Sequence, residues 1–244
     1  NVDHLFVRSA GFNCFGSGIA NWAKPMTAPP DSSYDEFRKA IPRMQKLGTK
    51  LVRIMSFAVP DALKPTAWDY ENEVIKRVTV LAKMAEDAGV VCVHENCMNW
   101  GGLSFEHTLK LVERVKSPAF KLVFDTGNPV FTDDRTKPAP FPKQSAWEFY
   151  SNVKDHVVYI HIKDGIWDGQ KANYTYPGLG EGDVRRIVED ALRSGYDGGI
   201  SIEPHIGAVF HDDTVKTDDD RRYAMYVEYG RRMEAMIADI RKAL

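Results

Sequence analysis

The stretch KLVFDTGN, residues 121–128, runs from an apolar segment through an aspartate into the residues of a turn. A short apolar run that stops at turn residues is typical of a buried β-strand. The same arrangement occurs in VVCVHEN (90–96), VVYIHIKD (157–164) and GISIEPH (199–205). Each of these segments therefore predicts a strand whose last residues are polar.

Helical segments separate such strands along the whole chain. Six strands are predicted, at Leu5–Ala10, Lys50–Phe57, Val90–Glu95, Phe120–Asp125, Val157–Lys163 and Gly199–Glu203. Six helices follow them, at Ser33–Leu47, Asp69–Ala88, Ser104–Val115, Ser145–Val153, Asp183–Ser194 and Thr217–Ala243. Ser33 and Glu36 have the spacing of a capping box, Asp183 is expected to cap its helix, and Gly48 and Gly89 predict helix ends. This alternation predicts a parallel sheet that is covered on both faces.

A doubly wound sheet and a (β/α) barrel both satisfy this order of elements. The barrel is favoured because polar residues recur at the C-terminal ends of the strands, where barrel enzymes build their active sites. No glycine fingerprint of a dinucleotide-binding turn follows any of the strands. The expected fold class is therefore α/β, a (β/α) TIM-type barrel, as a single domain over residues 1–244.

Composition excludes several classes of function. The chain has 244 residues, 43% of them hydrophobic, and a net charge of −2, so no overall positive field would attract nucleic acid or an anionic membrane. Three sparse cysteines, Cys14, Cys92 and Cys97, indicate reduced thiols and a cytoplasmic location. The chain begins with Asn1 rather than methionine, so the sequence is also compatible with an upstream signal sequence.

Four polar residues end the four later strands and form the candidate site. They are Glu95, Asp125, His161 and Glu203. In a parallel barrel these side chains point into one mouth, and three buried carboxylates would raise one another's pKa without a cation. Three carboxylates with one imidazole suit a single divalent ion, Mn²⁺ first, with Mg²⁺, Co²⁺ or Zn²⁺ as alternatives.

These strands, with HIKD at 161–164 and GEGD at 180–183, resemble the xylose isomerase-like superfamily, which includes ketose 3-epimerases, hydroxypyruvate isomerase and inosose dehydratase. The resemblance covers most of the chain and implies that Glu95, Asp125, His161 and Glu203 are metal ligands, one on each of four consecutive strands. It implies a sugar or sugar-phosphate isomerase or epimerase acting by α-proton transfer through a metal-stabilised enediolate. Glu95 and Glu203 would then be the general base and acid.

Two features depart from the superfamily pattern. Its barrel has eight strands with the ligands on the last four, so Leu5–Ala10 would be the third strand, and we expect the first two βα units to be missing from this sequence. An open barrel exposes strand edges, which favours a homo-oligomer. Many epimerase relatives also carry a histidine three residues after the ligand aspartate, where this chain has Asn128.

Other residues are candidate contacts for a small sugar or polyol. Lys163 and Asp164 follow His161, His205 lies two residues beyond Glu203, Asn128 follows Asp125, and Arg53 lies within a strand. Aromatic residues in the loops after strands are expected to form pocket walls: Phe12, Phe15, Trp22, Trp100, Trp167 and Tyr174.

The sequence is compared with three other functions besides an isomerase or epimerase: a dehydratase, a sugar-binding barrel and a nuclease. A metal-dependent dehydratase of a keto-inositol or related polyol would need the same metal and base. A non-catalytic sugar-binding barrel is favoured if two βα units are missing. A DNA-repair nuclease of the endonuclease IV type is disfavoured, because only one of seven histidines is at a ligand position and the net charge is negative.

Overall fold

A computed structural model describes residues 9–10, 24–60, 67–206, 208–209, 212–216 and 219–244 of the chain. Six parallel strands form its main sheet in the order β1-β2-β3-β4-β5-β8. They are β1 (Ser9–Ala10), β2 (Leu51–Ile54), β3 (Val91–Glu95), β4 (Phe120–Asp125), β5 (Val157–Ile162) and β8 (Gly199–Ile202). All six coincide with predicted strands, although the first four residues of the predicted Leu5–Ala10 lie outside the described residues.

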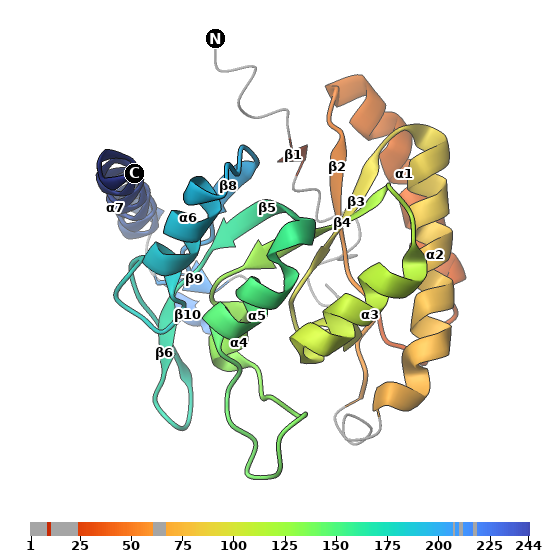
Figure 1. Ribbon diagram of the computed structural model, residues 1–244, viewed down its shortest axis with the longest axis horizontal. Coiled ribbons are helices and arrows are strands. Elements are labelled where there is room, and N and C mark those ends of the chain that lie inside the picture. Colours follow the sequence, from red (N-terminus) through yellow and green to blue (C-terminus); the bar gives the residue numbers. More distant parts are fainter. Residues whose placement is uncertain (1–8, 11–23, 61–66, 207, 210–211, 217–218) are drawn as a thin grey trace.

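Helices line one side of this curved sheet, each packed against the next (Figure 1). They are α1 (Asp31–Leu47), α2 (Glu71–Ala88), α3 (Phe105–Val115), α5 (Ala146–Val153), α6 (Val184–Arg193) and α7 (Asp219–Ala243). This order of strands and helices confirms the expected (β/α) class, as a partial barrel. None of the helices in the described residues has an apolar stretch of the length that a bilayer requires.

Side chains alternate between the two faces of the sheet, as the pleat requires, and the β4–β5 pairing has one irregularity between Leu122 and Val123. Most residues on the outer face are apolar and pack into the helices, among them Val52, Ile54, Cys92, Leu122, Phe124, Ile160 and Ile162, all of them buried. Burying such side chains stabilises the fold by roughly 1.5–3 kcal/mol each. The opposite face carries Arg53, Glu95, Asp125 and His161 together with the buried Val93 and Val123. Within the described residues, helices cover the outer face, and the opposite face combines these two apolar side chains with the polar ones.

The first helix begins earlier than the sequence predicts. Its first residue is Asp31, directly after Pro30, whose φ of −73° already suits a helix. Ser33 therefore lies buried inside the helix rather than capping it, and the predicted capping box is wrong. Asp183 does precede α6, but its side chain makes no capping hydrogen bond. Gly48 and Gly89 end their helices in the left-handed conformation, with φ of 68° and 67°, as predicted.

Several predicted loops contain secondary structure of their own. The segment after β5 forms a hairpin of β6 (Gly165–Trp167) and β7 (Ala172–Tyr174), and the segment after β8 forms a hairpin of β9 (Ala208–Val209) and β10 (Asp212–Lys216). A short helix, α4 (Asn128–Phe131), follows β4. All of these follow the C-terminal ends of parallel strands, the edge at which the polar residues gather.

Candidate metal centre and active site

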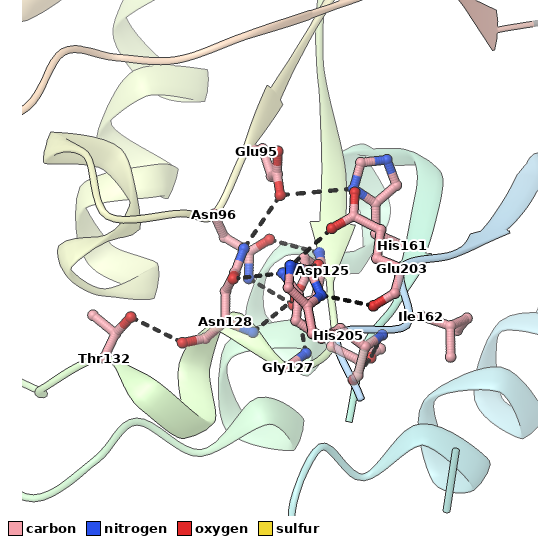
Figure 2. Close-up of polar contacts among 12 residues, drawn as sticks. Glu95, Asn96, Asp125, Gly127, Asn128, Thr132, His161, Ile162, Glu203 and His205 are labelled. Atoms are coloured by element: carbon pink, nitrogen blue, oxygen red, sulfur yellow. Dashed lines mark hydrogen bonds and ion pairs between the residues drawn. The ribbon is translucent and has the colours of Figure 1, made fainter. Parts of the chain in front are cut away.

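Four side chains from four parallel strands meet at one point (Figure 2). Glu95 and Asp125 end β3 and β4, His161 lies near the end of β5, and Glu203 directly follows β8. Each offers a ligand atom, and these atoms all lie within 4.8 Å of one another. The structure thus brings together all four residues predicted as metal ligands.

The donor set fits a divalent cation. Oδ2 of Asp125 and Nδ1 of His161 are buried and make no hydrogen bond of good geometry. Their close polar neighbours are ion-pair partners: Lys163 Nζ lies 2.9 Å from Asp125 Oδ2, and Oε1 of Glu203 and Oε1 of Glu95 lie 2.9 and 3.6 Å from His161 Nδ1. Buried polar atoms normally have a hydrogen-bond partner, so two poorly satisfied atoms that face the same centre are suited to metal ligation.

Arg53 fixes Glu95 from the neighbouring strand. Its guanidinium donates a hydrogen bond of 2.6 Å to Oε2 of Glu95, a side chain that is only 2% exposed. Burial raises the pKa of Glu95, but the charge of Arg53 and the nearby His161 outweigh burial and lower that pKa to about 2. Glu95 is therefore held ionised and in one orientation.

Asn128 and Lys163 connect the carboxylates to one another. Lys163 Nζ donates to Asn128 Oδ1 at 3.0 Å and lies 3.3 Å from Oε2 of Glu203. Asn128 in turn donates from Nδ2 to Oε1 of Glu95 at 3.2 Å. Because Lys163 also lies beside Asp125, its ammonium group is in contact with two of the four candidate ligands.

Burial and neighbouring charges shift the pKa values of the candidate ligands in opposite directions. Burial raises the pKa of Asp125 to about 6, although Lys163 opposes the change. Burial lowers the pKa of His161, yet the negative charge and close contact of Glu203, with a smaller effect of Glu95, outweigh burial and raise it to about 10. Burial likewise raises the pKa of Glu203, but His161 and Lys163 reverse this and hold it well below its usual value.

Asn96 positions Asp125, and the sequence reading missed it. Its side-chain amide donates to the Asp125 carbonyl at 2.9 Å and accepts from the Asp125 N–H at 2.7 Å. Oδ1 of Asp125 accepts further hydrogen bonds from the N–H groups of Gly127 and Asn128, at 2.9 and 2.7 Å. These contacts leave Oδ2 directed to the centre. An amide residue immediately after a strand-end glutamate was the only sequence signal for this role.

Asp164 organises a glycine-rich loop instead of reaching into the centre. Its carboxylate accepts hydrogen bonds from the N–H groups of Gly165, Gly178, Gly180 and Gly182, at 2.8–3.1 Å. A Cβ on Gly180 would lie 2.4 Å from Oδ1 of Asp164, so this position accepts only glycine. The predicted contact of Asp164 with a substrate is therefore corrected to anchoring the segment that carries the β6–β7 hairpin.

Of the other predicted substrate contacts, His205 and Tyr174 lie beside the candidate metal centre. The ring of His205 stacks on Tyr174, with 5.0 Å between centroids, and its Nδ1 lies 2.9 Å from the Glu203 carbonyl, so both rings lie beside the site.

Trp100 is fully buried and donates to the Ala67 carbonyl, so its predicted role in the pocket wall is wrong. Trp167 lies under Lys143, 3.8 Å from its Nζ. The remaining predicted wall residues, Phe12, Phe15 and Trp22, lie outside the described residues.

The family model described as xylose isomerase-like TIM barrel matches residues 6–223. The chain belongs to this family. It is similar to an inosose dehydratase of Lacticaseibacillus casei, with 24% identity over 225 residues that cover 83% of this chain and 70% of that protein.

Solved structures show the same fold. A D-tagatose 3-epimerase-like protein superposes with a TM-score of 0.66 and 17% identity over 91% of this chain and 77% of its own. The IOLI protein with a binding zinc atom superposes with a TM-score of 0.62 and 16% identity over 91% of this chain and 75% of its own. These relatives are named as an epimerase-like protein and a dehydratase, which are names of enzymes. The cluster of Glu95, Asp125, His161 and Glu203, which could hold a metal ion, is compatible with an enzyme of this family.

Proposed function

We propose that this protein is a divalent-metal-dependent sugar or sugar-phosphate isomerase or epimerase that works by α-proton transfer. One observation carries the proposal: two glutamates from separate strands approach the same imidazole. His161 Nδ1 lies 2.9 Å from Glu203 Oε1 and 3.6 Å from Glu95 Oε1. A substrate carbon held between them would have one carboxylate on each side, the arrangement that removal and return of a proton on opposite faces requires.

The two glutamates differ in setting, which supports different tasks. Glu95 is 2% exposed and fixed by Arg53 and Asn128, whereas the side chain of Glu203 is 28% exposed and less enclosed. Glu203 is the better placed to accept a proton from an entering substrate, and Glu95 to return one from the opposite side. A cation held by Glu95, Asp125, His161 and Glu203 would polarise the substrate carbonyl and stabilise the enediolate.

A dehydratase is the second candidate, because a relative with similar sequence is an inosose dehydratase. The same base would remove an α-proton, and a β-hydroxyl would then leave as water. The two reactions differ in product: isomerisation or epimerisation retains all the atoms of the substrate, whereas dehydration loses one water.

Deuterium exchange tests the proposal directly. The protein with Mn²⁺ would be incubated in D₂O with ketoses, ketose phosphates and keto-inositols, and NMR would follow deuterium entry beside the carbonyl. We expect exchange without loss of water; exchange with loss of water would establish the dehydratase. No exchange with any compound would contradict both and favour a sugar-binding protein. Parallel runs with Mg²⁺, Co²⁺ and Zn²⁺ would rank the metals.

A matched pair of variants ties the exchange to the site. Glu203→Gln keeps the size of the side chain but removes the base, so exchange should fall by about 10²–10⁴-fold. Glu234→Gln, at an exposed position of α7, should retain full exchange. Full exchange in Glu203→Gln would eliminate Glu203 as the base. The homo-oligomer and the cytoplasmic location remain predictions from the sequence, and sedimentation velocity would test the first.

A further inference from the structure

The charges of the candidate centre do not sum to zero once a metal ion is counted. Three carboxylates, Glu95, Asp125 and Glu203, contribute −3, and the two cationic side chains in contact with them, Arg53 and Lys163, contribute +2. His161 is neutral as a metal ligand. The protein groups therefore sum to −1, and a divalent cation changes the sum to +1.

Both cationic side chains are fixed in place. Lys163 is 8% exposed and held by Asp125, Glu203 and Asn128, and Arg53 is held by Glu95. Asp164, the acidic residue next in sequence to Lys163, is already compensated by four backbone N–H groups. A buried net charge is costly. The positive charge of the loaded site is thus best balanced by a group that the ligand brings.

We infer, on the basis of the proposed function, that the site selects substrates that carry an anionic group, a carboxylate or a phosphate, close to the reacting carbonyl. Arg53 and Lys163 supply the selection. Without them the same metal and carboxylates would sum to −1 and would disfavour an anion. The guanidinium of Arg53 offers a planar fork suited to oxyanions, and Lys163 adds a point charge. Neutral sugars would leave the positive charge uncompensated.

Three four-carbon probes separate the charge of a ligand from its shape. Isothermal titration calorimetry of the full chain with Mn²⁺ would compare erythritol, which is neutral, with erythronate and erythritol 4-phosphate. Each anion should bind at least about tenfold more tightly than erythritol at low salt. The tighter of the two anions identifies the group as a carboxylate or a phosphate. Equal affinity for all three probes would overturn the inference.

A charge-removing variant tests whether the protein, rather than the metal alone, attracts the anion. Lys163→Met should reduce the anion preference by about tenfold, whereas Lys39→Met, at an exposed position of α1, should leave the preference unchanged. An unchanged preference in Lys163→Met would overturn the role of Lys163. Anion preference without deuterium exchange would refute only the proposed reaction, and exchange without anion preference would refute only this inference.

Discussion

The ammonium group of Lys163 lies 2.9 Å from Oδ2 of Asp125, one of the four candidate metal ligands. A cation at the centre and the lysine share this oxygen, so they repel each other at short range. Removing the lysine charge with Lys163→Met should tighten Mn²⁺ binding by at least about tenfold, because the repulsion disappears and Asp125 loses its other counterion. Calorimetric titration with Mn²⁺ measures this change. Weaker binding in the variant would show that the lysine supports the metal site.

Metal affinity should increase with pH. Ligation requires a neutral imidazole and ionised carboxylates. In the metal-free protein the pKa of His161 is raised to about 10 and that of Asp125 to about 6. Metal binding therefore displaces protons from both groups below pH 6 and from His161 alone between pH 6 and 10. Affinity should rise about tenfold per pH unit over the latter range and then level off.

Proton release can be counted directly. Calorimetry in buffers with different ionisation enthalpies should show about one proton released per metal ion near pH 8, since His161 alone is then protonated. Binding with no proton release at this pH would exclude His161 as a ligand that must lose a proton.

Asp164→Asn should loosen the glycine-rich loop. An amide oxygen carries no full charge, and its NH₂ group would face backbone N–H donors that now bind the carboxylate of Asp164. We expect a loss of about 1–3 kcal/mol in the free energy of unfolding and faster hydrogen exchange in residues 176–183. Asp197→Asn, at an exposed position, is the control. Unchanged exchange rates in this segment would show that the loop does not depend on the carboxylate.

Leu122→Ala should destabilise the fold through the core alone. Leu122 is 2% exposed on the outer face of β4, and truncating such a side chain typically costs about 2–5 kcal/mol. Leu47→Ala removes the same atoms from a side chain that is 52% exposed, and should cost less than about 0.5 kcal/mol. Urea denaturation compares the two, and similar losses would contradict the assignment of Leu122 to the core.

Sequence periodicity was sufficient to place the parallel strands, because a buried strand between helical segments has a clear apolar pattern. It also placed the four candidate ligands, since strand ends meet at one edge. It failed where tertiary contacts decide: Ser33 has the spacing of a cap, yet the helix begins at Asp31. Trp100 follows a strand, which is the usual position of a residue in a pocket wall, but its indole is buried and donates to the Ala67 carbonyl.

The contacts that orient the ligands could not be predicted for the same reason. Asn96 reaches the backbone of Asp125 on the next strand, and Asp164 gathers N–H groups from up to 18 residues away. The periodicity of the sequence predicts neither set of hydrogen bonds, because each depends on how a loop packs against the sheet.

The four candidate ligands, one on each of four successive strands, have a consequence for how the protein opens. A bound ion would join segments that lie far apart along the chain, from Glu95 to Glu203, through a single atom. None of the four strands β3, β4, β5 and β8 could then separate from its neighbours without releasing the ion. Metal loading should therefore convert independent fluctuations of these strands into one cooperative event, so that their amide protons exchange together.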